Sequence, residues 1–397
     1  MKRRLHELLI CPSCLSMLDL TVLDRERVKY PNLRIQETRC RKWCSYPSDK
    51  LVKLKANDAP RPCMDCYGDE ITRGALHCRE CGRHYPIADG IPRFLPDSQE
   101  IYKDILREYE KVKNQAVKTS AEEHDLKEFQ RLHGNTRASY SKEWLTYTRL
   151  ESDEENIYLL LRWTGREKEF FKDKLTVDCG CGGGRYTRIA AMLGAEVVGL
   201  DLGEGVRQAQ RLNADFPFTY FVQGNVMQPP LARDTFDFAF SVGVLMTTPS
   251  THDSLLSISR LPRPGGDLSV WVYPTDWLTT PIITPKLPRF EFFNKRFRTA
   301  TLKMPHWYVD FLSRVLAVFP LIPGSEKIQQ MFSIHPYRDV RIQQNFDWYS
   351  PQYQFFHTND EVAAWFREAG YTDITINEPL PVSVKGKKPA VTAAKSK

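Results

Sequence analysis

Five residues have the types and the spacing that bind a nucleotide. Asp178, Gly180, Gly182 and Gly184 alternate in the run VDCGCGGGRY, and Asp201 follows the first glycine by roughly 20 residues. Glycine lets the backbone turn tightly and approach a ligand closely, where a Cβ atom would push the ligand away. A carboxylate at the end of the following strand can accept hydrogen bonds from both ribose hydroxyls. The spacing therefore predicts a site for an adenosine-containing cofactor.

The elements around these residues are those that such a site needs. Residues 175–177 form a β-branched and aliphatic run, which predicts a short buried strand ending at Asp178. Residues 185–193 carry apolar side chains at helical spacing, and Gly194 suits the end of a helix. The run EVVGLDL then predicts a second strand, which ends at Asp201. Strand, glycine-rich turn, helix, strand and acid together make a nucleotide-binding βαβ unit.

Two cofactor classes fit this unit. A dinucleotide fingerprint reads G-x-G-x-x-G, but Arg185 stands where the third glycine belongs. The other frame, D-x-G-x-G-x-G, resembles motif I of the class I S-adenosylmethionine-dependent methyltransferases, here of the type 11 domain. This resemblance implies an α/β, Rossmann-like domain of seven strands and S-adenosylmethionine as the cofactor. It also implies that Asp178 helps to position the amino-acid end of the cofactor and that the glycines admit its methionine moiety.

Later runs are similar to further motifs of the same family. Gly224, Asn225 and Val226 follow the strand-like run 219–223, and Asn225 stands where the family usually has the Asp of a Gly-Asp pair, whose carboxylate bonds the adenine amino group. Asn225 keeps an acceptor oxygen but has no charge. The block SVGVLMTTPS resembles the end of the fourth strand, without the two histidines that often stand there. Residues 263–274 resemble the turn into the fifth strand, and two strands near the end of the chain match the family's closing hairpin.

Eight of the ten cysteines lie in the first 81 residues, as four pairs. The pairs are Cys11 with Cys14, Cys40 with Cys44, Cys63 with Cys66, and Cys78 with Cys81. Closely spaced cysteines present two thiolates to one metal, and two such pairs complete a tetrahedron. Eight thiolates therefore predict two closed, structural Zn²⁺ sites, and a redox or disulfide framework is the alternative. Four pairs combine into two sites in three ways, so the spacing does not fix the partners.

The segments around the first and last pairs resemble a small zinc-ribbon family. They read LHELLICPSCLSMLDL and GALHCRECGRHYPIADGIPRFLP. That family includes the activator subunit of eukaryotic tRNA and translation-factor methyltransferases. The resemblance implies one zinc ion held by Cys11, Cys14, Cys78 and Cys81. The remaining four cysteines, Cys40, Cys44, Cys63 and Cys66, would then form a second site in an insertion.

We therefore expect an α/β chain of four parts. The expected parts are a zinc-ribbon domain with an insertion at 1–96, a helical linker and cap at 97–173, a class I methyltransferase domain at 174–390 with a lid insertion at 275–357, and a disordered tail at 391–397. In the cap, Tyr140, Trp144 and Tyr147 fall on one helical face. They are expected either to cover the cofactor or acceptor pocket or to anchor the helix to the sheet.

A histidine near the end of the chain is the candidate catalytic base. His357 lies in an aromatic stretch that resembles, in several bacterial methyltransferases, a segment that caps the acceptor site. It could remove a proton from the acceptor as the methyl group arrives. The alternative is that His357 only satisfies the entrance of the following helix. Asn359 is expected to cap that helix, which should run to about Ala369.

Composition limits the remaining possibilities. The 397 residues carry a formal charge of +7, which permits a nucleic-acid partner without requiring one. No apolar run is long enough to span a bilayer, and the basic start MKRRLHELLIC is too short a signal, so we expect a cytoplasmic protein. The leading function is methyl transfer to a small-molecule or lipid-linked acceptor. The alternatives are a tRNA methyltransferase whose zinc ribbon activates it in cis, and a non-catalytic cofactor-binding interaction protein.

Overall fold

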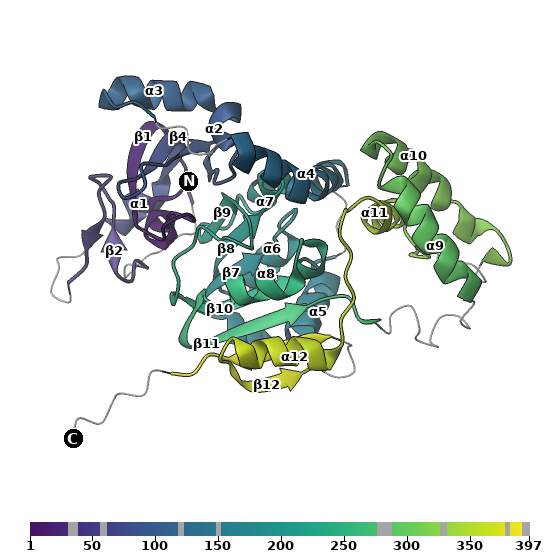
Figure 1. The fold of residues 1–397 in the computed structure, drawn as a ribbon. Coiled ribbons are helices and arrows are strands. Elements are labelled where there is room, and N and C mark those ends of the chain that lie inside the picture. The colour runs from purple at the N-terminus through teal and green to yellow at the C-terminus, as the bar shows by residue number, and fades with distance from the viewer. Residues whose placement is uncertain are drawn as a thin grey trace.

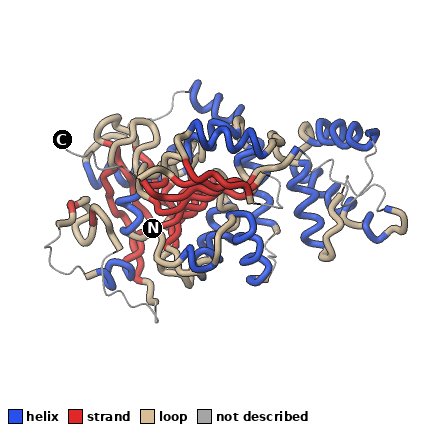
Figure 2. The backbone as a smooth tube through the Cα atoms, turned by 90° about the horizontal axis from the view of Figure 1, so that it is seen from below, coloured by secondary structure: helices blue, strands red, loops and turns tan. Residues whose placement is uncertain are grey.

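The computed structural model describes residues 1–30, 39–55, 62–117, 123–147, 152–275, 288–325, 332–377 and 382–390 (Figure 1). The expected tail at 391–397 lies outside the described residues, as do 276–287 and 326–331 of the expected lid insertion. In the described part, a large sheet has helices on both sides, and a smaller sheet formed by the N-terminal residues is joined to it (Figure 2).

The large sheet has the seven strands that the sequence predicts. Their order is β12-β13-β11-β10-β7-β8-β9, and only β13 runs antiparallel to its neighbours. The strands are β7 (Leu175–Cys179), β8 (Glu196–Asp201), β9 (Thr219–Gln223), β10 (Phe236–Val242), β11 (Pro262–Trp271), β12 (Thr372–Ile376) and β13 (Ser383–Lys387). The order reverses between β7 and β10, and a crevice opens at the carboxyl ends of the strands at such a switch point. This confirms the class I fold.

Helices cover both faces of this sheet. They are α5 (Asp153–Thr164), α6 (Arg185–Met192), α7 (Gly205–Leu212), α8 (Thr251–Ile258) and α12 (Asn359–Glu368). Adjacent residues of a strand point to opposite faces. Accordingly, Val197 packs in one apolar cluster with Leu160 of α5 and Ile189 of α6. Its neighbour Val198 packs in another cluster with Leu255 of α8.

The N-terminal residues form a second, antiparallel sheet. Its order is β1-β4-β5-β6, with β1 (Leu18–Arg27), β4 (Asp69–Cys78), β5 (His84–Ala88) and β6 (Ile91–Pro92). A two-stranded sheet of β2 (Trp43–Cys44) and β3 (Val52–Lys53), with helix α1 (Cys63–Gly68), lies in the loop between β1 and β4. Helices α2 (Ser98–Ile101) and α3 (Lys103–Lys113) follow, and α3 lies along this sheet in Figure 1.

The two sheets meet at the β9 edge of the large sheet. Just after β6, Arg93 forms a parallel bridge with Gln223 of β9, and the N–H of Phe94 donates to the Gln223 carbonyl at 2.9 Å. A second bridge joins Leu9 to Leu231. The N-terminal sheet therefore protects the backbone groups that an edge strand would otherwise expose.

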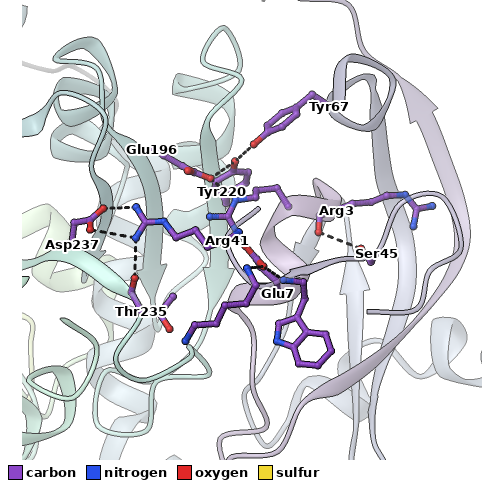
Figure 3. Close-up of polar contacts among 12 residues, drawn as sticks. Arg3, Glu7, Arg41, Ser45, Tyr67, Glu196, Tyr220, Thr235 and Asp237 are labelled. Atoms are coloured by element: carbon purple, nitrogen blue, oxygen red, sulfur yellow. Dashed lines mark hydrogen bonds and ion pairs between the residues drawn. The ribbon is translucent and has the colours of Figure 1, made fainter. Parts of the chain in front are cut away.

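A buried polar network crosses the same junction (Figure 3). The Arg4 guanidinium is almost fully buried and donates from Nε to Glu196 Oε1 at 2.8 Å. The Tyr220 hydroxyl donates to the same oxygen at 2.9 Å and lies 2.9 Å from the Tyr67 hydroxyl. Nearby, Arg41 pairs with Asp237. Because the contacts of Arg4, Tyr67 and Arg41 join the N-terminal part to the large sheet, the junction is held by charge as well as by apolar packing.

A helical cap lies over one end of the large sheet. It contains α4 (Glu123–Thr146), α9 (Pro288–Thr301), α10 (His306–Leu316) and α11 (Arg338–Tyr349), and α9 and α10 are the parts farthest from the sheet in Figure 1. Tyr147, directly after α4, donates a hydrogen bond to Asp310 of α10. No helix in the described part of the chain has both the length and the apolar character to cross a membrane.

One expected helix cap is wrong by a residue. Thr358, not Asn359, caps α12: its hydroxyl accepts from the N–H of Glu361 at 3.2 Å, and the Glu361 carboxylate accepts from the N–H of Thr358. This reciprocal pair is a capping box. The Asn359 side chain instead accepts from the N–H of Val382 at 2.7 Å, a contact across the fold that the local sequence does not reveal.

Candidate active site and candidate metal centre

A cavity of about 580 Å³ opens at the carboxyl ends of the parallel strands, between the sheet and the helical cap. Its floor comes from the loops after β7, β8, β9 and β10, and its roof comes from α4 and α11. Among the residues that line it are His133, Tyr140, Glu143, Trp144, Gly180, Gly182, Arg185, Asp201, Asn225, Val226, Val244, Tyr273, Gln343, Asp347 and Trp348. Hence the strand order and the cap together enclose one site.

The three predicted glycines all have positive φ angles. These are 96° for Gly180, 51° for Gly182 and 85° for Gly184, a region that only glycine adopts without strain. A Cβ atom would lie 2.4 Å from Val244 at Gly180 and 2.5 Å from Trp144 at Gly182. At Gly184 it would meet the helix α7 backbone. The glycines thus let the cap and helix α7 come close to the loop, a role that the sequence analysis did not foresee.

Asp201 lies at the end of β8, where the sequence predicted an acid for the ribose. Its carboxylate accepts from the N–H of Gly182 at 2.9 Å and from the N–H of Gly203 at 2.7 Å. Burial raises the pKa of Asp201, while these backbone hydrogen bonds oppose the rise. Since Asp201 lines the cavity and also fixes Gly182, it connects the glycine-rich loop to the next strand.

Asp178 lies behind the glycine-rich loop and is not among the residues lining the cavity. The Thr187 hydroxyl donates to its carboxylate at 2.7 Å. Burial raises the pKa of Asp178 to about 7, opposed by the bond from Thr187. Its placement therefore suits holding the start of α6 against β7, and the expected role at the amino-acid end of the cofactor stays a prediction.

Asn225 and Val226 line the cavity after β9, and their expected contact with the cofactor stays a prediction. The Asn225 side-chain oxygen accepts from the N–H of Met227 at 2.9 Å, and its nitrogen lies 3.2 Å from His133 Nε2. These contacts fix the orientation of the amide. The oxygen keeps a second lone pair that could meet an adenine amino group.

His357 does not line the cavity. Its Nε2 lies 2.9 Å from the Thr251 hydroxyl, and its ring packs edge-on against Trp365 at 4.9 Å between centroids. Burial lowers its pKa, opposed by Glu361. The histidine joins α8 to the start of α12, which is the structural alternative considered for it.

The predicted aromatic face of α4 does reach the cavity, and it brings an acid that the sequence analysis missed. Tyr140 and Trp144 line the cavity, and so does Glu143 between them. On α11, Asp347 faces the same space. Positions 140, 143, 144 and 147 share one helical face, so helical periodicity was a signal for Glu143. No comparable signal marked Asp347.

Four cysteines converge at the tip of the N-terminal sheet. The sulfur atoms of Cys11, Cys14, Cys78 and Cys81 all lie within 4.8 Å of one another. Cys11 Sγ lies 3.6 Å from Cys81 Sγ, and Cys14 Sγ lies 3.3 Å from Cys78 Sγ. This is the pairing that the zinc-ribbon resemblance implied. Four convergent thiol groups fit a tetrahedral Zn²⁺ ion with no open position.

The other four cysteines surround a second, much smaller pocket. Cys40, Cys44, Cys63 and Cys66 line it together with Arg4, Arg39 and Tyr67. Among the described residues, no three of these sulfur atoms lie within 4.8 Å of one another. The insertion therefore brings the predicted second set to one place, in a looser arrangement than the first.

Two separate stretches of the chain match known protein families. Residues 177–270 match the family described as methyltransferase domain, and residues 2–90 match the family described as Trm112p-like protein. Methyltransferase phqN of Penicillium fellutanum is 32% identical over 100 residues, which are 24% of this chain and 31% of that protein. Ubiquinone biosynthesis O-methyltransferase of Proteus mirabilis is 31% identical over 99 residues, 23% of this chain and 39% of that protein. The chain thus spans well under half the length of these curated relatives.

Among solved structures, one similar example is a complex of the Haloferax volcanii Trm112 methyltransferase activator with a methyltransferase. The identity is 15% and the TM-score is 0.36, over 63% of this chain and 97% of that one. The sheet order, the glycine-rich loop and the two family matches lead to one conclusion: the chain joins a Trm112p-like domain to a methyltransferase domain of the class I fold.

Proposed function

We propose that this protein transfers a methyl group from S-adenosylmethionine to a small-molecule or lipid-linked acceptor. One observation carries the proposal: the cavity runs from the glycine-rich loop and Asp201 to the aromatic side chains of the cap. A single enclosed space thus has one end suited to a nucleoside and another suited to an apolar or aromatic acceptor. The matched methyltransferase domain supports the same reaction.

The chain's own residues would bind and orient both reactants. Asp201 offers its remaining lone pairs to the ribose hydroxyls, and Asn225 and Val226 stand where the adenine ring would lie. Bound S-adenosylmethionine supplies an electrophilic methyl group, so the protein needs mainly to align a nucleophile and exclude water. Trp144 over the glycine-rich loop and Trp348 on α11 provide that shielding.

We also propose that Zn²⁺ ions are structural here. The support at the first site is the convergence of Cys11, Cys14, Cys78 and Cys81. The support at the second site is that Cys40, Cys44, Cys63 and Cys66 share one small pocket. Binding of zinc to thiolates contributes directly to the folding free energy of small domains.

An RNA acceptor is the second candidate. Its support is the Trm112p-like domain, which resembles an activator of tRNA methyltransferases and packs on the β9 edge beside the cofactor loops. Incubation with methyl-labelled S-adenosylmethionine and a fractionated cell extract separates the two candidates. Label in small molecules or lipids supports the leading proposal, whereas label that nuclease releases from RNA replaces it. Cofactor binding with no label in any fraction would favour the non-catalytic alternative.

The cofactor site can be tested without the acceptor. Asp201→Ala removes at least one hydrogen bond made by a charged group, worth roughly 1.5–3 kcal/mol, so binding of S-adenosylmethionine should weaken by at least about 10-fold. Isothermal titration calorimetry measures this directly. Asp215→Ala, an exposed change just beyond α7, is the matched control and should bind normally. Equal affinity of the two variants would contradict the proposed cofactor site.

A further inference from the structure

Two carboxyl groups line the cavity from different helices of the cap, the buried Glu143 on α4 and the partly buried Asp347 on α11. Glu143 of α4 is only 3% exposed, and Gln343 Nε2 donates to its Oε1 at 3.1 Å. Its second oxygen, Oε2, is buried and has no hydrogen-bond partner among the described residues. A buried acceptor without a partner costs free energy, and it is one that a ligand could satisfy.

Asp347 of α11 differs in that its carboxylate already has donors. The Tyr273 hydroxyl donates to Asp347 Oδ2 at 3.4 Å, and the Tyr140 hydroxyl also donates to this carboxylate. Two hydroxyl donors favour the ionised form. Both acids line the cavity, and Glu143 is the one with a buried carboxylate oxygen that has no hydrogen-bond partner among the described residues.

We propose that Glu143 accepts the proton of the methyl acceptor, and that the acceptor is a hydroxyl or an amine rather than a carboxylate. This inference rests on the proposed function. A hydroxyl, or an amine that is protonated at neutral pH, must give up a proton for the methyl transfer, whereas a carboxylate is already ionised. Two acidic groups in one enclosed cavity would also repel an anionic acceptor.

The charges around Glu143 suit this role. Asp347 on α11 and Asp201 on β8 are acids, and Arg185 on α6 is the cation acting on Glu143. Burial and the nearby Asp347 raise the pKa of Glu143 well above its ordinary value, and burial also raises the pKa of Asp347. Interacting carboxyl groups titrate as a pair, so the pair should keep a proton to a higher pH than either carboxyl group would alone.

The sulfonium charge of S-adenosylmethionine would change the protonation of the Glu143–Asp347 pair. A positive charge in the same cavity favours the ionised carboxylate and should drive the shared proton off when the cofactor binds. In the reaction, the acceptor's lone pair forms the new bond to the methyl carbon while the carbon–sulfur electron pair stays on sulfur. The acceptor's proton then moves to Glu143, so the loss of the sulfonium charge and the loss of the carboxylate charge occur together.

Calorimetry in buffers of different ionisation enthalpy tests this without an acceptor, because it counts the protons released on binding. Near neutral pH, S-adenosylmethionine should release more protons than S-adenosylhomocysteine, whose sulfur is uncharged. Glu143→Gln should reduce this difference by at least about half, since one of the two coupled acids is gone. Glu128→Gln, on the solvent side of the same helix, should leave it unchanged.

The outcomes separate this inference from the proposed function. If the wild type binds both ligands with equal proton release, or if Glu143→Gln keeps the full difference, the inference is wrong while cofactor binding stands. If the wild type binds neither ligand, both proposals fail. Should Glu143→Gln not fold, as judged by circular dichroism, Asp347→Asn must reduce the difference instead, and an unchanged difference overturns the inference.

Turnover provides a second measurement. In the labelled-extract assay, Glu143→Gln should lower the rate of label transfer by about 10²- to 10⁴-fold, the usual contribution of a general base. Glu143→Asp, which keeps the carboxylate, should recover part of that loss with an altered pH profile. A purely structural role would give equal rates for both variants, and that result would exclude Glu143 as the proton acceptor.

Discussion

At the scale of single residues, Asp178 shows how burial, as the largest cause, sets a pH dependence. Its folded-state pKa is about 7 against an ordinary value of 3.8. The folded state therefore prefers the protonated acid, and this contribution to stability is full below about pH 4 and lost as the pH rises through about 7. Thr187, Arg185 and Asp201 are the groups that act on it.

Asp178→Asn should remove this dependence. Relative to the wild type, the variant should gain roughly 2–4 kcal/mol of unfolding free energy between pH 5 and pH 8, because the buried amide never ionises. Urea denaturation of the ligand-free protein at several pH values measures it. Asp215→Asn, at an exposed position, should follow the wild-type curve. If the unfolding free energies of Asp178→Asn and the wild type change with pH in the same way, Asp178 has an ordinary pKa.

At the scale of elements, the N-terminal cysteines decide how many metal ions the chain holds. We expect two zinc ions per chain by elemental analysis. Cys78→Ser should remove one ion and Cys63→Ser the other, because each leaves an incomplete tetrahedron. Ser13→Ala, next to a ligand on the exposed turn, should retain both.

The two proposed metal sites can therefore fail separately. If the wild type binds one zinc ion and Cys63→Ser still binds one, the proposed second site is wrong and the first site stands. If the wild type binds no zinc, both proposed sites are wrong and the cysteines are thiol groups or disulfides.

Helix α10 bears on the lipid-linked form of the acceptor. Its inner side packs through Val309 against Phe346 and Tyr349, while Trp307 and Phe311, one turn apart, are 66% and 54% exposed. Exposed basic residues lie just before it on α9, including Lys295. Exposed aromatic side chains on a helix, together with basic side chains on the preceding helix, are typical of contact with an anionic membrane surface.

The double substitution of Trp307 and Phe311 by serine should weaken binding to vesicles containing anionic phospholipid by at least about 10-fold, since each aromatic side chain loses 1.5–3 kcal/mol of apolar burial. Co-sedimentation measures the bound fraction. Tyr158→Ser, an exposed aromatic change on α5, is the control. If the wild type does not bind these vesicles, a freely diffusing acceptor is the better proposal.

At the scale of the whole molecule, the buried junction makes the Trm112p-like domain part of the methyltransferase structure. Arg4→Met would leave the Glu196 carboxylate buried without its guanidinium, a change that costs about 3–5 kcal/mol. We expect urea unfolding to separate into two transitions as the N-terminal domain detaches first. Arg25→Met, whose side chain is 60% exposed beside Asp69, should keep the wild-type transition. A single unshifted transition for Arg4→Met would show that apolar packing alone holds the junction.

The sequence by itself determined the features that depend on neighbouring residues. The alternating apolar runs, the glycine-rich turn and the acid at the end of the next strand predicted β7, α6, β8 and Asp201, because strand and helix periods and turn geometry are local properties. The resemblance of these motifs to the class I methyltransferases implied the seven-stranded sheet, and the spacing of the cysteine pairs predicted thiolate metal sites.

Tertiary structure decided which distant residues meet. Glu143 and Asp347 are about 200 positions apart, and only the packing of α4 on α11 brings them to one cavity. His357 had a suitable side chain and sequence context, yet packing directs it to Thr251 instead of the cavity. The glycines satisfied a motif, but their close neighbours are Val244 and Trp144 from elsewhere in the fold. Contacts of this kind depend on the arrangement of whole elements, which local periodicity does not specify.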